Sequence, residues 1–215
     1  MALKDIVSLD LILKIVPIVI SFLSLIVSLV VAWSNRKTLQ VEISKTLDVI
    51  EGGSVFLIND EGIPEPYGDG VFTTIEVVNP SPKDIAFFDL RAFYPETNVN
   101  IHLLTKRTML DKYRDKTLWR AIELEKGNVN LMELVIPDTN YGIFKANSFT
   151  RFHIVMFPDP DASKLFLSFK VAIRAKFFKD PFAVTGRKKF KHYGVAYDIS
   201  SWTESLRQSK ESEKE

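Results

Sequence analysis

The chain of 215 residues has room for one domain of ordinary size and one further segment. Its apolar fraction of 46% and charged fraction of 26% exclude a chain that is disordered throughout, and the formal net charge of +1 gives no overall attraction to nucleic acid. Cysteine is absent, which excludes disulfides and thiolate metal sites but fits either side of a membrane.

The first feature along the chain is an uncharged apolar stretch, residues 15–35. As a helix with a rise of about 1.5 Å per residue it spans about 30 Å, which matches the hydrocarbon core of a bilayer. It is apolar on all sides, as a helix facing lipid must be. Pro17 falls in the first turn of this expected helix, where its missing N–H costs little. The sequence therefore predicts an N-terminal flank, 1–14, and a transmembrane helix, 15–35.

The C-terminal end of this stretch has the residues of a membrane boundary. Trp33 lies at interfacial depth, and Arg36 and Lys37 follow in water. A helix buried in a soluble core is disfavoured, because no other segment could surround it. A cleaved signal sequence is the stronger alternative, since Val30 and Ala32 satisfy the small-residue rule for cleavage after Ala32.

Two observations favour an uncleaved anchor over a signal sequence. Signal cores run about 7–15 residues, which is shorter than this stretch. Asp5 and Asp10 also interrupt the basic leader that a signal sequence has. We expect a single-pass protein of the cell membrane.

Charge counting gives the expected orientation of this anchor. Lys4 and Lys14 precede the apolar stretch, whereas Arg36, Lys37 and Lys45 follow it. Because positive charge is retained on the cytoplasmic side, three against two favours a cytoplasmic C-terminal domain.

Three serines, Ser21, Ser24 and Ser28, share one face of the expected helix because their spacings are three and four. Small polar faces allow transmembrane helices to approach closely, which would support a homo-oligomer or a partner in the membrane. The alternative, which we favour, is that the hydroxyls bond to carbonyls of their own helix.

Beyond residue 37 the pattern changes to the alternation of half-buried strands. The stretch "LQVEISKTLDVI" places Leu39, Val41 and Ile43 on one face. Many short strands separated by Pro- and Gly-containing turns favour a mainly β fold, an antiparallel immunoglobulin-like β-sandwich over 38–200 with one short helical insertion. Further strands are expected at 54–58, 71–78, 85–94, 99–104, 118–124, 129–135, 148–157, 165–178 and 187–197, with the helical insertion near 106–115 and a polar, disordered tail at 201–215.

Four segments give the chain a resemblance to a known group of proteins. They are "WSNRKTLQVEI", "TTIEVVNPSPKDIAFFDLRAFY", "IPDTNYGIFKANSFTRFHIVMF" and "LFLSFKVAIRAKF". Together these resemble uncharacterised small bacterial single-pass membrane proteins with an immunoglobulin-like β-sandwich domain. The resemblance implies a membrane-tethered β domain and transfers no functional residues.

No catalytic, cofactor-binding or metal-binding residues are expected. His102, His153 and His192 lack the close spacing of metal ligands and are expected to be ordinary strand residues. The sequence has no GxSxG motif and no phosphate loop. Two acidic stretches, "NDEGIPEPYGDG" and "DPDAS", lack the ligand spacing of an EF-hand and are expected to be solvated turns.

A basic cluster is expected where the last two strands form a hairpin. Six like charges on one sheet face would attract anionic lipid at about 1 kcal/mol per residue, or a protein partner. The alternative that we favour is an edge that discourages strand pairing, and nucleic acid is not expected because no recognised binding motif accompanies the charge. The residues are Arg174, Lys176, Lys179, Arg187, Lys189 and Lys191.

The sequence thus predicts a membrane-tethered, non-enzymatic binding or interaction module of the accessory or immunity type. Two alternatives remain. One is a secreted, soluble β-sandwich that binds a ligand after signal cleavage. The other is an anionic-lipid-binding domain that uses the basic hairpin 174–192.

Overall fold

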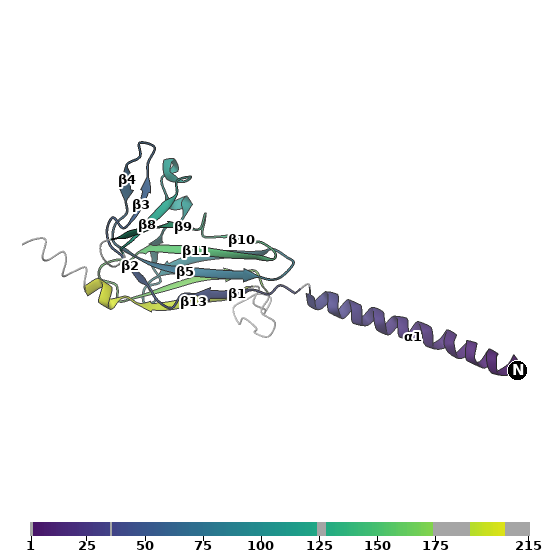
Figure 1. The fold of residues 1–215 in the computed structure, drawn as a ribbon. Coiled ribbons are helices and arrows are strands. Elements are labelled where there is room, and N and C mark those ends of the chain that lie inside the picture. The colour runs from purple at the N-terminus through teal and green to yellow at the C-terminus, as the bar shows by residue number, and fades with distance from the viewer. Residues whose placement is uncertain (1, 35, 124–127, 174–189, 205–215) are drawn as a thin grey trace, which may run out of the picture.

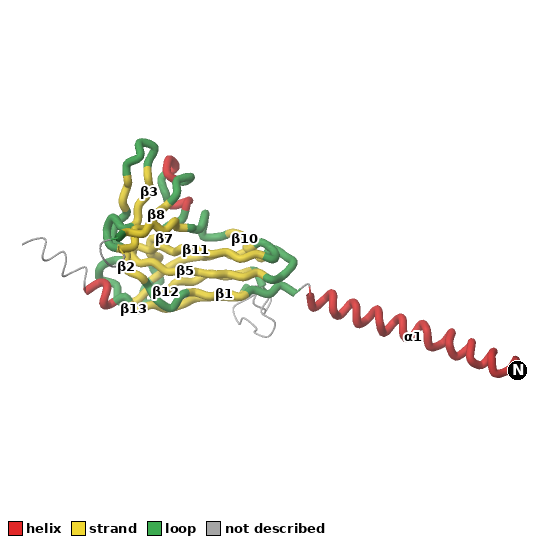
Figure 2. Tube along the Cα trace, viewed as in Figure 1, coloured by secondary structure: helices red, strands yellow, loops and turns green. Residues whose placement is uncertain are grey.

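The structure is a computed structural model that describes residues 2–34, 36–123, 128–173 and 190–204. It begins with a long helix, α1 (Ala2–Ser34), and continues as a domain of antiparallel strands (Figure 1). Within that domain the described helical segments are short turns (Figure 2). The mainly β, antiparallel class is therefore confirmed, and the immunoglobulin-like assignment stays a prediction.

The larger of two sheets is a curved path of antiparallel strands. Its order is β1-β5-β11-β7-β6-β12-β13, and in addition β2 pairs with β5 and β10 pairs with β6. The bounds are β1 (Gln40–Ile43), β2 (Asp48–Ile50), β5 (Gly70–Asn79), β6 (Ile85–Phe93), β7 (Asn100–Leu103), β10 (Gly142–Phe144), β11 (Ser148–Phe157), β12 (Lys164–Val171) and β13 (Lys191–Asp198).

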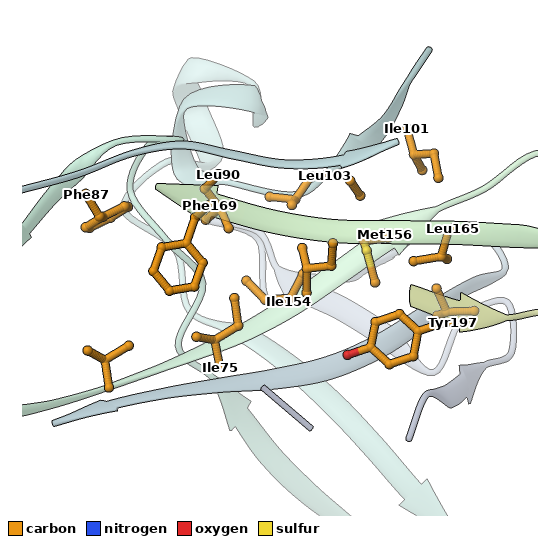
Figure 3. Close-up of a cluster of buried hydrophobic side chains, with 14 of the residues drawn as sticks. Ile75, Phe87, Leu90, Ile101, Leu103, Ile154, Met156, Leu165, Phe169 and Tyr197 are labelled. Atoms are coloured by element: carbon orange, nitrogen blue, oxygen red, sulfur yellow. The ribbon is translucent and has the colours of Figure 1, made fainter. Parts of the chain in front are cut away.

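The main core lies between two arms of this sheet. One arm contains β5 and β11, the other contains β6, β12 and β13, and β7 pairs with both β11 and β6. Figure 3 shows Ile75 and Ile154 of the first arm in one cluster with Phe169 and Leu165 of the second. Burial of alternate residues from both arms produces the strand periodicity seen in the sequence.

Side-chain hydrogen bonds join the two ends of the curved sheet. The Tyr197 hydroxyl on β13 donates to the Ser44 carbonyl just after β1, and it lies 3.1 Å from the Thr73 hydroxyl on β5. Burial raises the pKa of Tyr197, and the Thr73 contact opposes that shift. The phenol therefore bridges β13 to the first arm where no ladder is formed.

A smaller sheet adds a third layer to the domain. Its order is β4-β3-β8-β9, and Figure 1 places it at the end of the domain away from α1. A second core lies beneath it, where Leu57 and Leu118 of this sheet pack with Phe72 and Val155 of the larger one. The bounds are β3 (Val55–Ile58), β4 (Pro64–Pro66), β8 (Leu118–Glu123) and β9 (Val129–Leu134).

Most expected strands form close to their expected bounds. The strand at 148–157 is β11 with the same ends. The stretch "LQVEISKTLDVI" forms two strands, β1 and β2, because residues 44–47 leave the ladder between Ile43, opposite Ile75, and Asp48, opposite Phe72. The parts of the last two expected strands at 174–178 and 187–189 lie outside the described residues.

The helical insertion expected near 106–115 is confirmed as two short 3₁₀ turns, Lys106–Thr108 and Asp111–Tyr113. The first begins at Thr105, whose hydroxyl accepts from the Thr108 N–H, while the Thr108 hydroxyl accepts from the Thr105 N–H. Near the C-terminus, residues 200–204 form a helical turn in which Trp202 is buried. The rest of the tail, 205–215, lies outside the described residues.

Candidate binding surfaces

The apolar helix projects from the domain without packing against it (Figure 1). The segment Leu13–Trp33 has a mean hydropathy of 2.8, and 0% of it is buried. By length and composition it can cross a membrane, and the same criteria admit a signal sequence.

The boundary residues of the predicted anchor lie at the C-terminal end of α1. Trp33 is 71% exposed, and the Arg36 guanidinium lies 5.6 Å from the centre of its ring. Lys37 is exposed one residue further on. An aromatic ring beside two cations is the arrangement that favours the boundary between lipid and water.

One expectation about the helix is wrong. Because α1 begins at Ala2, Pro17 lies in the helix interior, not in a first turn. Proline there has no N–H to donate to the Leu13 carbonyl one turn earlier, and the nearby Ser21 hydroxyl does not restore that bond. The Ser21 hydroxyl donates to the Pro17 carbonyl at 2.7 Å.

The serine face also uses its hydroxyls within the helix. The Ser28 hydroxyl donates to the Ser24 carbonyl at 2.8 Å. This repeats the bond from Ser21 to Pro17 about two turns further along the helix. This is the backbone bonding that we favoured from the sequence. Self-association through Ser21, Ser24 and Ser28 stays a prediction.

The end of the domain nearest α1 is tied together by a buried asparagine. Residues 35–39 separate α1 from β1, so this end lies within about 20 Å of the helix terminus. The Asn79 amide donates to the carbonyls of Lys83, Phe144 and Lys145, and its oxygen accepts from Ser81. Asn79 is fully buried and holds the turn "NPSPKD" against the turn before β11.

An exposed apolar pair lies beside these turns. Val78 on β5 is opposite Phe149 on β11, and both are level with Gln40, the first residue of β1. The exposed fractions are 39% for Val78 and 55% for Phe149. The pair therefore faces water close to the predicted membrane surface.

The basic cluster predicted from the sequence is described in the structure at one position. β12 and β13 do pair, with Val171 opposite Lys191, which confirms the pairing on which the cluster depends. Lys191 is exposed, and its ammonium lies 4.6 Å from the centre of the Tyr193 ring. The other members, Arg174, Lys176, Lys179, Arg187 and Lys189, lie outside the described residues.

A basic hollow lies where the edge of β6 changes partner from β10 to β7. Its volume is about 580 Å³, and its floor contains the buried side chains of Leu90 and Leu103. Arg91, His102 and Arg107 contribute to its wall. The lining residues include no Asp or Glu, although the Asp89 carboxylate lies beside Arg91 just outside the lining.

A bulge in β6 shapes this hollow. Between its contacts with Lys170 and Ser168 of β12, β6 has one residue more than its partner, and Asp89 takes a φ of 56°. The bulge turns the Leu90 N–H toward the Asn140 carbonyl, to which it donates. The Asp89 carboxylate binds Lys170 at 2.6 Å and lies 3.8 Å from Arg91 Nε. The sequence shows no signal of this hollow, because its residues come from separate segments.

His153 connects β11 to the end of the smaller sheet. The imidazole Nδ1 of His153 accepts from the Val135 N–H at 2.9 Å, and the backbone N–H of His153 donates to the Val135 carbonyl. Burial, followed by the charges of Arg151 and Arg120, holds the pKa of His153 below its usual range. All three histidines lie in strands, as expected: His102 in β7, His153 in β11 and His192 in β13.

The acidic turns form structural contacts. The Asp69 carboxylate accepts from the Gly52 N–H, and Asp60 pairs with Lys116. Within the described ranges, no group of three His, Asp or Glu side chains gathers as ligands for a metal ion.

Comparisons with known proteins add little to this description. No protein-family model matches the chain, and no curated protein matches it in sequence. Among solved structures, the chain is similar to the crystal structure of the yjhA protein from Bacillus subtilis, with a TM-score of 0.37 and 11% identity, covering 74% of this chain and 92% of that one. A likeness of this size carries no argument about function.

Proposed function

We propose that the chain is a membrane-tethered binding module without catalytic activity, of the accessory or immunity type. In this proposal α1 is an uncleaved single-pass anchor in the cell membrane, and the β domain binds a protein partner on the cytoplasmic side. The observation that supports the tether is the bare apolar surface of Leu13–Trp33. Lipid is the medium that would bury a helix of that length and hydropathy.

Extraction of membranes from cells that express the full chain with a C-terminal tag tests this tether. We expect the intact chain to stay in the membrane fraction after alkaline carbonate and high salt, because about 30 Å of apolar helix cannot leave lipid without exposure to water. A soluble product whose N-terminus is Trp33 would instead support the secreted alternative.

Protease treatment of intact cells tests the proposed orientation. A C-terminal tag in the cytoplasm is protected until the membrane is opened with detergent. Removal of the tag from intact cells would place the β domain outside and would exclude cytoplasmic partners.

A second candidate function is contact with anionic lipid at the anchor-side end of the domain. The exposed pair Val78 and Phe149 favours contact with lipid, since both lie at the end of the domain that follows α1. Lys83 and Lys145 are exposed in the adjoining turns and favour anionic headgroups. The absence of cysteine makes a single labelled position possible, such as Lys145→Cys with an environment-sensitive dye. We expect a blue shift of its emission in anionic nanodiscs and none in neutral ones, with Leu110→Cys, in the loop between the two 3₁₀ turns, as the matched control.

A further inference from the structure

The free edge of β9 has exposed apolar side chains. Val129, Leu131 and Val135 are 60%, 52% and 51% exposed. Their neighbours Met132 and Leu134 point the other way and pack in the second core. β9 therefore has one face in the protein interior and one face in water, and the face in water carries the apolar side chains of Val129 and Leu131 beside Glu133.

At alternate residues of β9 the backbone N–H and C=O groups point away from β8, toward the edge of the sheet. Ala121 on β8 is opposite Leu131, and its N–H donates to the Ser54 carbonyl on the far side of β8. In an antiparallel ladder the residue opposite such a position directs its own N–H and C=O away from the shared ladder. Leu131 and Glu133 consequently direct their backbone groups to the free edge.

The end of this edge is already used for hydrogen bonding. Val135 has the same outward direction, and both its N–H and its carbonyl bond to His153 of β11. No hydrogen bond to another described residue occupies the same side of Leu131 or Glu133. Among the described residues, the edge of the strand is therefore hydrogen-bonded at Val135 but has unpaired backbone groups at Leu131 and Glu133.

The opposite edge of the same sheet is protected. β4 has the sequence Pro64-Glu65-Pro66, and proline has no N–H to offer an added strand. Strand addition to the smaller sheet is consequently possible at β9 and blocked at β4.

The charges beside β9 select the composition of an added strand. On the side-chain face of β8 and β9 that lies in water, Glu133 is opposite Trp119, and Glu123 is opposite Val129. The outward-facing residues of β8 and β9 in the described range include no Lys or Arg. A second copy of β9 would bring a further Glu133 to this face, whereas a strand with basic residues would pair with it.

We propose that β9 is a strand-addition site for an extended segment of a partner protein. On the face that continues the outer face of β9, at every second residue, this segment has apolar residues beside Val129 and Leu131 and Lys or Arg beside Glu133. The backbone groups of Leu131 and Glu133 bond to the added strand, the apolar side chains cover Val129 and Leu131, and the basic side chain pairs with Glu133. This inference rests on the proposed function as a binding module and names the surface and the partner's chemistry.

The test uses the full chain in a neutral maltoside detergent and a labelled peptide as long as β9. The peptide has two valines and one lysine at alternate positions on one face, and threonine at the positions between them. Binding is measured by fluorescence anisotropy. We expect binding that is lost when the peptide is N-methylated along its hydrogen-bonding side, because main-chain bonds supply the affinity. A peptide with glutamate in place of lysine should bind more weakly because it meets Glu133.

Three variants separate backbone from side-chain effects. Leu131→Pro removes the outward N–H and leaves the β8 ladder intact, so we expect affinity to fall about tenfold or more. Leu131→Ala keeps that N–H and should weaken binding less than Leu131→Pro does. Glu133→Lys should reverse the preference between the lysine and glutamate peptides and covers the case in which the proline variant does not fold.

Two results would overturn the inference. One is equal peptide affinity in the unsubstituted chain and a folded Leu131→Pro variant, or no binding to either. The other is a dimer in dilute detergent that Leu131→Pro converts to monomer, since the occupant is then a second copy of the chain. Neither result alters membrane extraction, so failure of this inference is distinguishable from failure of the proposed tether.

Discussion

The two halves of β5 and β11 differ in what covers their outer face. Toward α1, Val78 and Phe149 form an exposed cross-strand pair. Toward the other end, Phe72 and Val155 occupy the same face of the same strands and are buried by the smaller sheet. The same two strands are therefore half-buried at one end and buried on both faces at the other, and a substitution on one face should have a cost that depends on its position.

The largest difference is expected from truncation of Phe72. Phe72→Ala should lower the free energy of unfolding by about 3–5 kcal/mol, because it leaves a cavity beneath the smaller sheet. Val78→Ala, on the same face of β5, should change it by about 0.5 kcal/mol or less. Urea unfolding of the full chain in detergent, followed by tryptophan fluorescence, measures both; equal effects would mean that the smaller sheet does not seal this face.

The next effect concerns the bond that joins β11 to the end of β9. His153→Leu leaves the Val135 N–H without its acceptor and should cost about 1–3 kcal/mol of unfolding free energy. His153→Asn keeps a side-chain acceptor and is the matched control, with a smaller expected loss. Hydrogen exchange at Val135 gives the local readout, and unchanged protection in His153→Leu would contradict this role.

The same histidine predicts a pH dependence. The pKa of His153 is lowered in the folded protein, mainly by burial, so the unfolded chain takes up the proton first as pH falls. Its contribution to stability is therefore complete above about pH 6.5, the pKa of an unperturbed histidine, and declines as pH falls below that value. Unfolding free energies between pH 7.5 and 5 should fall more steeply for the unsubstituted chain than for His153→Asn.

The smallest effect is expected from the ion pair between the two halves. Arg151 binds Glu76 across β11 and β5 at 2.8 Å, with 51% and 36% of the two side chains exposed. Arg151→Ala should cost about 0.5 kcal/mol, and less at high salt, because exposed charges are screened. A loss as large as that of His153→Leu, unaffected by salt, would show that this region is better sealed than the structure indicates.

Local patterns were enough to predict the class of fold and most strands. Alternation between apolar and polar residues sets β11 at Ser148–Phe157, and the turn chemistry around Asn79 marks the end of β5. The uninterrupted apolar character of Leu13–Trp33 sets the candidate membrane helix without reference to the rest of the chain. These features depend on residues that are close in sequence, and they can therefore be predicted from the sequence alone.

Contacts between distant segments decided the rest. The smaller sheet turns Phe72 and Val155 from surface positions into core, and it requires residues from 55–66 and 118–134 to meet. The basic hollow likewise brings Arg91, His102 and Arg107 together from three segments, beside a bulge that periodicity does not reveal. The sequence by itself determined an apolar helix followed by antiparallel strands, because both follow from local periodicity. Only tertiary structure decided which strand edge, β9, was left open, because the direction of a backbone N–H depends on the register with the neighbouring strand.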